Sequence, residues 1–201
     1  MAKSYTELFQ LVRSLAGVNA FTSDEENDIL RLANRRLYEA YSASQMWTQY
    51  LVVGEERTIS SDQVVPFIQT PKNDISEFQR IHRDQPFLNT GSMEYNFYVD
   101  SSGAHVMNLG GTDASSVYVT YKKRFTDFSK TSQDIPEEFF YYAAHATYAD
   151  FLRMDGQTSK AFDEENKAST YLATELERLD LISNNNNVRR KFTTYVSTQS
   201  R

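Results

Sequence analysis

Hydrophobic residues near the N-terminus recur at the spacing of a helix. The segment from Tyr5 to Ala16 has an apolar residue every three or four positions: Leu8, Leu11, Val12 and Leu15. Ser4 and Glu7 have the spacing of a capping box at its start, and Gly17 is a typical residue at a helix end. The pattern therefore predicts a first helix over Tyr5–Ala16.

A second apolar stripe predicts a helix that runs to about Ser44. Its members share one helical face: Ile29, Ala33, Leu37, Ala40 and Tyr41. Ser23 and Glu26 have the spacing of a second capping box. Because only a short loop separates the two helices, we expect residues 1–46 to form a helical hairpin.

Between Trp47 and Phe128 the period of the hydrophobic pattern falls toward two, which is typical of strands. Ser101, Ser102 and Gly103 lie between two such segments and indicate a hairpin turn. A further turn is indicated by Gly110, Gly111, Thr112 and Asp113. We expect an antiparallel β-domain over 47–130, with strands at 50–53, 57–59, 64–67, 78–82, 95–100, 104–108 and 117–125.

Helical spacing then returns for two more segments. Pro136, followed by Glu137 and Glu138, is typical of a first helical turn, and Asp155 with Gly156 is expected to end that helix. The next helix has an apolar face of Ala161, Ala168, Leu172, Leu176 and Leu179. We expect a second helical hairpin over 131–183, ended by Asn184, Asn185, Asn186 and Asn187.

Together these elements predict an α+β fold. It is a four-helix bundle with an antiparallel β-domain inserted between helices 2 and 3, plus an extended C-terminal docking tail over 184–201. The tail combines strand formers with basic residues and has no acidic side chain. Such a segment is either disordered or lies on another chain, as an added strand or in a groove with spaced pockets.

The charge of the chain is uneven. The net charge is −6, which argues against a surface that grips nucleic acid all round. Residues 133–180 contain eleven acidic and four basic side chains, a net of −7, whereas the tail carries Arg189, Arg190, Lys191 and Arg201. An acidic body with a basic arm favours docking on an acidic groove of a partner or of a neighbouring copy.

The sequence offers little chemistry. It has no cysteine, no phosphate-binding glycine motif and no nucleophile or zinc motif, so we expect no enzyme, no cofactor and no metal. His82 and His105 are expected on the solvated faces of strands, and His145 is expected to be a hydrogen-bonded structural residue. Thirteen tyrosines and thirteen phenylalanines favour subunit interfaces over a single core. No apolar run is long enough to span a bilayer, so no membrane association is expected.

The order of these parts resembles the head-to-tail adaptor (connector, tail tubular protein A-like) family of tailed bacteriophages. The resemblance covers nearly the whole chain and is carried by the sequence of its segments. These are the capped helix from Thr22 to Leu37, the aromatic exit at Met46 and Trp47, the hairpin segments 95–99 and 104–106, the helix start at 134–139, the long acidic helix and the polar C-terminal extension.

The resemblance implies a structural virion protein of the phage neck, made in the cytoplasm of a bacterial host. Its copies form a ring, commonly of twelve, that docks on the portal protein, extends the channel for genomic DNA without specific binding, and carries the tail tube or nozzle protein. The portal-docking residues would be Val188, Arg189, Arg190, Lys191, Phe192, Tyr195 and Val196, and the tail-facing loops would be Asp100, Ser101, Ser102, Gly103, Gly110, Gly111, Thr112 and Asp113.

Two alternatives stay open from the sequence. One is another virion ring, such as a head-completion or tail-terminator protein. The other is a cytoplasmic ligand- or DNA-binding module with a basic C-terminal arm.

Overall fold

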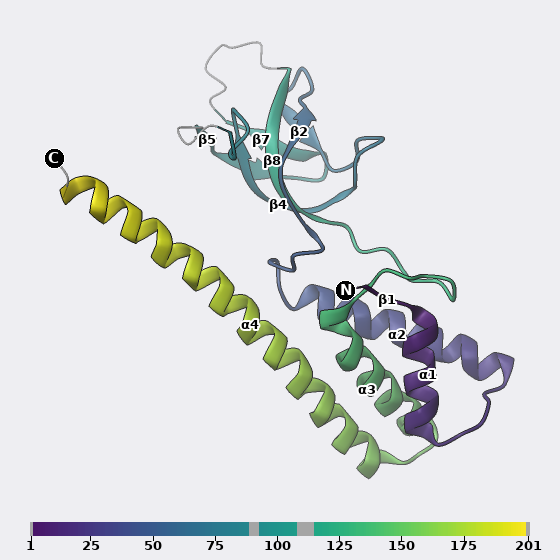
Figure 1. Ribbon diagram of the computed structural model, residues 1–201. Coiled ribbons are helices and arrows are strands. Elements are labelled where there is room, and N and C mark those ends of the chain that lie inside the picture. Colours follow the sequence, from purple (N-terminus) through teal and green to yellow (C-terminus); the bar gives the residue numbers. More distant parts are fainter. Residues whose placement is uncertain (1, 89–92, 108–114, 200–201) are drawn as a thin grey trace. The chain divides into compact units, whose positions relative to one another are not determined.

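The computed structural model describes the backbone of residues 2–88, 93–107 and 115–199, and the side chains of these residues as far as Ile182 (Figure 1). The chain divides into two compact units. Met1–Ser44 and Asp127–Arg201 form one, which we call the helical unit, and Gln45–Thr126 forms the other, the β unit.

The helical unit contains four helices and a short two-stranded sheet. In chain order its elements are β1 (Ala2–Lys3), α1 (Tyr5–Ala16), α2 (Ser23–Ser42), β9 (Ile135–Pro136), α3 (Glu137–Met154) and α4 (Thr158–Gln199). β1 pairs antiparallel with β9, which fixes the N-terminus beside the start of α3.

The helix starts follow the sequence signals closely. The capping box of Ser4 and Glu7 is confirmed, with the Glu7 N–H donating to Ser4 Oγ at 3.1 Å, and Gly17 ends α1 in the left-handed conformation. The box predicted at Ser23 and Glu26 is wrong by one residue. Thr22 keeps extended backbone and accepts the Glu25 N–H, so Thr22 is the cap and Ser23 is already helical.

The prediction of a four-helix bundle with an inserted β-domain is wrong. The fold is α+β, with four helices and several antiparallel sheets, but α3 is a central helix against which α1, α2 and α4 each pack. A bundle helix buries one stripe, whereas α3 is buried on nearly every side. Its small residues let neighbours approach from several directions: Ala143, Ala144, Ala146, Thr147 and Ala149.

The predicted extended tail is also wrong. α4 has 42 residues and continues as a helix through the four asparagines to Gln199. Asparagine costs a helix less than about 0.7 kcal/mol per residue, and adding turns to an existing helix avoids the cost of nucleation. At 1.5 Å per residue α4 is about 63 Å long, and Figure 1 shows it running well past α3.

The β unit consists of two antiparallel sheets. Their strands are β2 (Leu51–Thr58), β3 (Val64–Pro66), β4 (Ile75–His82), β5 (Glu94–Tyr95), β6 (Phe97–Val99), β7 (Gly103–Val106) and β8 (Ser116–Lys123). One sheet has the order β2-β8-β4-β5 and the other β3-β7-β6. Apolar residues of both sheets share one core, which includes Val65, Ala104, Ile81 and Val119.

Three predictions about the strands need correction. The segment 95–100 is divided between β5 and β6, which belong to different sheets. The segments 50–53 and 57–59 belong to the single strand β2, whose pairing with β8 shifts register between Val52 and Glu55. His82 was expected on a solvated face but is buried. β4 has two register irregularities, between Ile75 and Glu77 and between Phe78 and Arg80, so strict alternation does not hold along it.

Candidate functional site

A buried ion-pair network anchors the first half of α4. Arg36 on α2 is 6% exposed and binds Asp150 on α3 through two hydrogen bonds of 2.6 Å, from Nε and Nη2. Its Nη1 and Nη2 also donate to Glu165 on α4, at 3.1 and 2.9 Å. One guanidinium therefore joins three helices through charge-assisted hydrogen bonds.

The network is completed by groups that neutralise its remaining charge. Arg153 donates to both Asp150 and Glu165, at 2.9 and 3.0 Å. Glu39 accepts hydrogen bonds from Arg36 and from the Tyr142 hydroxyl. Burial raises the pKa of Tyr142 to about 12, and the nearby Glu39 carboxylate adds to the shift. The cluster is thus well satisfied, as buried charges must be.

Sequence analysis missed this network, although a signal for it was present. Arg36 lies three residues after Ala33 and four before Ala40, so it occupies the buried face of α2. A charged residue on an apolar helical stripe requires a partner inside the protein. The partner could not be identified, because Asp150 is 114 residues away in sequence.

A second contact between α3 and α4 involves His145. Its Nδ1 lies 2.7 Å from Glu164 Oε2, and Lys167 donates to Glu164 Oε1 at 2.6 Å. The expectation that His145 is hydrogen-bonded is confirmed. Burial tends to raise the pKa of Glu164, but hydrogen bonds from Lys167 and His145 outweigh it and hold the pKa below its usual value.

The helical unit should lose stability in acid. Burial tends to raise the pKa of Asp150, but the Arg36 hydrogen bonds and charge hold it below its usual value, as the partners of Glu164 do for that residue. Carboxylates with depressed pKa values stabilise the fold fully above their unfolded pKa, about 4, and lose this effect as the pH falls through the folded pKa.

We therefore expect the urea midpoint to be nearly constant from pH 7 to 5 and to fall below about pH 4. The urea midpoint of the native chain is compared with that of the variant Asp150→Asn, which has no titratable group at this position. The stability gap between the native chain and this variant should shrink as the pH falls, because Asp150 itself becomes protonated. A gap that stays constant to pH 3 would contradict the assigned role of the carboxylate.

The residues predicted to dock on the portal lie in the last turns of α4. Their backbone is helical, so docking as an added strand would require this part of α4 to unfold. Their side chains are outside the described part of the structure. Before them, α4 is already leaving the packed core. Leu179 is buried, whereas Leu181 and Ile182 are 65% and 49% exposed.

The residues predicted to face the tail divide into two groups. Asp100, Ser101, Ser102 and Gly103 form the turn between β6 and β7, as the sequence indicated. Gly110, Gly111, Thr112 and Asp113 lie outside the described residues. Hydrogen bonds from the Ser102 side chain and backbone, with a smaller effect of His105, lower the pKa of Asp100 to about 2.

The Asp100, Ser102 and His105 side chains do not form a catalytic triad. In a triad the acid and the nucleophile bind opposite nitrogens of the imidazole. Here Ser102 Oγ and Asp100 Oδ2 both contact Nε2 of His105, at 3.2 and 2.8 Å. The His105 ring also stacks on Tyr98, with ring centres 4.4 Å apart. The group therefore stiffens the hairpin instead of activating the serine.

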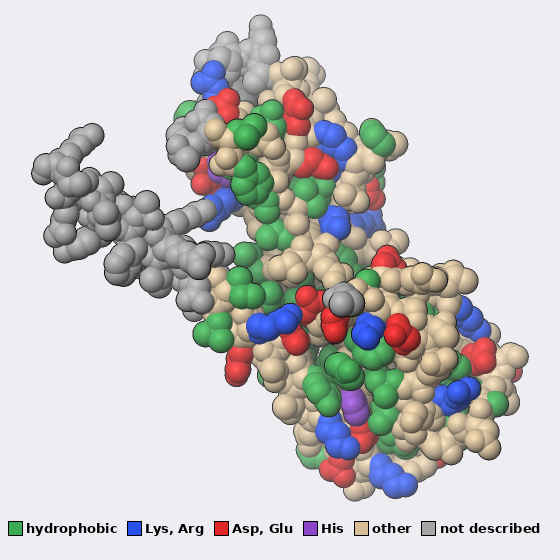
Figure 2. Space-filling view, in the orientation of Figure 1, with side chains coloured by type: hydrophobic (Ala, Val, Ile, Leu, Met, Phe, Trp, Pro, Cys, Tyr) green, Lys and Arg blue, Asp and Glu red, His purple; other side chains and the backbone are tan. Residues whose placement is uncertain are grey.

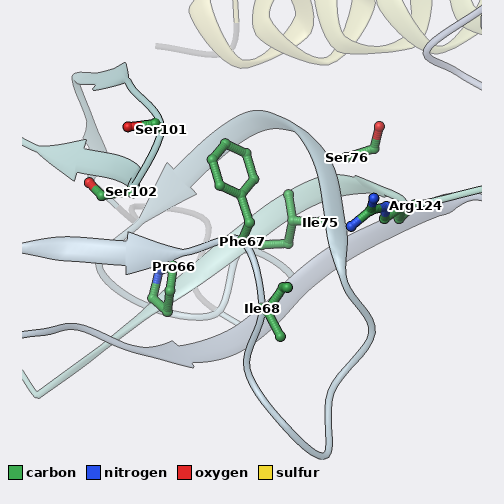
Figure 3. Close-up of a pocket in the computed structure, with 8 residues that line it drawn as sticks. All are labelled: Pro66, Phe67, Ile68, Ile75, Ser76, Ser101, Ser102 and Arg124. Atoms are coloured by element: carbon green, nitrogen blue, oxygen red, sulfur yellow. The ribbon is translucent and has the colours of Figure 1, made fainter.

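A groove of about 520 Å³ lies beside this hairpin. Figure 3 shows Arg124 and Ser76 at one end, Ser101 and Ser102 at the other, and apolar side chains between them. The apolar residues are Pro66, Phe67, Ile68 and Ile75. The lining combines apolar side chains with polar ends and contains one cation and no carboxylate, so the groove lacks an acid and base for catalysis.

The described residues contain no group of three or more histidines and acids that could hold a metal ion. Within the same part of the chain, no helix has the length and apolar character needed to cross a membrane. No protein-family model matches the chain, and no curated protein matches it.

Proposed function

We propose that this chain is a head-to-tail adaptor of a tailed bacteriophage. Copies would assemble into a ring, with twelve as the expected number, which docks on the portal, continues the DNA channel and carries the tail or nozzle. The role is structural and involves no catalytic step. It rests on the order of segments that resembles the adaptor family, and one feature of the fold supports it.

That feature is the length of α4 beyond its anchor. α4 packs against α3, its buried residues extend from Ala161 to Leu179, and the ion pairs of Glu165 fix its first half. From Leu179 the helix continues for twenty residues, about 30 Å, to Gln199. A helix held firmly at one end and carried this far past its own core is suited to reach a separate protein.

The distribution of charge agrees with this role. The continuing part of α4 contains three consecutive basic residues, whereas residues 133–180 are strongly acidic. A basic end is steered toward an acidic partner, and an acidic body repels DNA phosphates and does not hold them. In the β unit, the groove beside the Asp100–Gly103 turn offers an apolar recess to the next tail component.

Deletion of residues 188–201 should abolish attachment to the portal and leave the fold intact. The deleted part lies beyond the last buried residue described in α4, so the thermal midpoint should change little. Binding is measured by native mass spectrometry or electron microscopy of purified portal rings mixed with the adaptor. The full chain should add to the ring in a fixed ratio, and the deleted chain should not.

A charge variant refines this test. Arg189, Arg190 and Lys191 changed together to Ala should weaken docking strongly at physiological salt, because the steering charge is lost. The matched control is Arg31→Ala, which removes a charge from an 82% exposed side chain on α2. Docking of the deleted chain at full strength would show that residues 188–201 are not the portal-binding element.

A further inference from the structure

The outer face of the α3–α4 pair carries an exposed aromatic cluster. Tyr141 on α3 is 49% exposed and stacks on Tyr171 of α4, which is 43% exposed, with ring centres 5.5 Å apart. Tyr171 also stacks on His145 at 5.3 Å. We call these three residues the tyrosine patch. Figure 2 shows hydrophobic, acidic and basic side chains close together on the surface of the helical unit.

One turn from the patch, two carboxylates share a single guanidinium. Nη2 of Arg178 lies 3.6 Å from Glu138 Oε1 and 2.9 Å from Glu175 Oε2. Oε2 of each glutamate is buried and accepts no hydrogen bond from the described part of the chain, so the Arg178–Glu175 contact is an ion pair without hydrogen-bond geometry. The two carboxylates therefore share one cation, which leaves a net negative charge beside the patch.

The side chains of this surface favour arginine as the partner residue that binds to it. Glu138 precedes Tyr141 by three residues and Glu175 follows Tyr171 by four, so each carboxylate lies on the same helical face as its tyrosine. A guanidinium stacks on tyrosine rings and donates to carboxylates through a planar fork. Lysine can do the first but lacks the fork geometry for the second. A partner segment with adjacent arginines is therefore complementary to the patch.

The chain itself contains such a segment, at Arg189, Arg190 and Lys191. Its own copy cannot fold back onto the patch, because α4 is a continuous helix and Arg190 lies twelve residues, about 18 Å, beyond Arg178 along the axis. The donor must be another molecule. We propose that the tyrosine patch, with Glu138 and Glu175, binds the arginine-rich end of α4 from a second copy of this chain.

This contact joins two different surfaces, so it repeats from copy to copy and produces a ring or a filament. The inference goes beyond portal docking and does not require it. Successive residues of a helix are 100° apart around its axis, so three adjacent basic positions cover more than one side of α4. Contact with a neighbouring copy therefore leaves positions on α4 available to a portal.

Mixing two defective variants tests the proposal. The patch variant carries Tyr141→Ala and Tyr171→Ala, and the arm variant carries Arg189→Ala and Arg190→Ala. Sedimentation equilibrium of the full-length chain should show concentration-dependent self-association, and each variant alone should associate at least about tenfold more weakly. Because each variant keeps one intact surface, their mixture should form a 1:1 dimer that grows no further.

The control variants are Tyr38→Ala, a 55% exposed tyrosine on α2, and Arg31→Ala, and both should associate like the native chain. A native chain that remains monomeric at millimolar concentration, or a variant mixture that stays monomeric while circular dichroism shows both folded, would overturn the proposal. Binding of the patch variant to portal rings distinguishes the contact between copies from docking on the portal. If it binds portal rings but never pairs with the arm variant, only the contact between copies fails.

Discussion

Replacing Arg36 with alanine should lower the free energy of unfolding of the helical unit by about 3–5 kcal/mol. The Arg36 side chain is 8% exposed and binds carboxylates from three helices: Glu39, Asp150 and Glu165. Without it, the largely buried Asp150 keeps weaker compensation, a hydrogen bond from the half-exposed Arg153 and the charge of Arg35. Urea unfolding followed by circular dichroism at 222 nm measures the loss.

The neighbouring residue supplies a matched control. Arg35 is 65% exposed and pairs with Glu39 at 3.3 Å on the surface of the same helix. An exposed pair of this kind contributes less than about 1 kcal/mol, so Arg35→Ala should have a small effect. Equal losses for the two variants would show that burial of the network does not determine its strength.

A double variant separates the energy of the pair from the cost of leaving one charge alone. Arg36→Met combined with Asp150→Leu replaces both buried charges by apolar groups of similar size. It should recover much of the stability lost in Arg36→Ala, because no isolated charge then remains between α2 and α3. If the double variant is as unstable as the single one, the buried pair itself is the stabilising element.

The same network has a mechanical consequence for the proposed adaptor. Glu165 lies in the third turn of α4, and its ion pairs hold the first half of that helix against α2 and α3. Because α4 extends about 30 Å beyond Leu179, a small change in its angle at the base moves its far end by a large distance. The buried pairs at Arg36 therefore set the direction in which the basic end of α4 is presented.

Local signals in the sequence were sufficient for much of the fold. The helical periods located α1, α2 and α3, and the turn at Ser101–Ser102–Gly103 located the β6–β7 hairpin. These features depend on residues close together in the chain, so one sequence contains them. The shift of the second cap from Ser23 to Thr22 shows the limit, because both residues begin an acceptable capping box.

Features that depend on distant residues could not be predicted in the same way. The alanines of α3 fit a one-faced bundle helix as well as a helix covered on several sides, and only the packing of α1, α2 and α4 distinguishes these cases. The strand formers after Val188 favoured an extended tail, but the preceding turns of α4 carry the helix through them. Two features of the candidate site, the basic segment and the hairpin, were identified from the sequence. The Arg36 network and the tyrosine patch were identified only from the structure.

Replacing Gly103 with alanine should destabilise the β unit by about 3 kcal/mol or more. Gly103 has φ +146°, a conformation that side-chain-bearing residues rarely adopt. A Cβ atom there would lie 2.1 Å from the carbonyl oxygen of Val65 and 3.0 Å from Cα of Pro66. Both neighbours are backbone of β3, which pairs with β7 at this position, so the clash can be relieved only by separating two strands.

The matched control is Gly17→Ala. Gly17 also has a positive φ, +68°, but a Cβ atom would meet nothing within 4 Å, so the cost is limited to about 1 kcal/mol of backbone strain. Thermal unfolding monitored by near-ultraviolet circular dichroism follows the buried aromatic residues of both units, among them Tyr95 and Tyr121 of the β-unit core. Gly103→Ala should lower that midpoint far more than Gly17→Ala does. Similar shifts for both would mean that β3 and β7 can move apart at little cost, and the Asp100–Gly103 turn would then be too loosely held to serve as a rigid contact for a tail component.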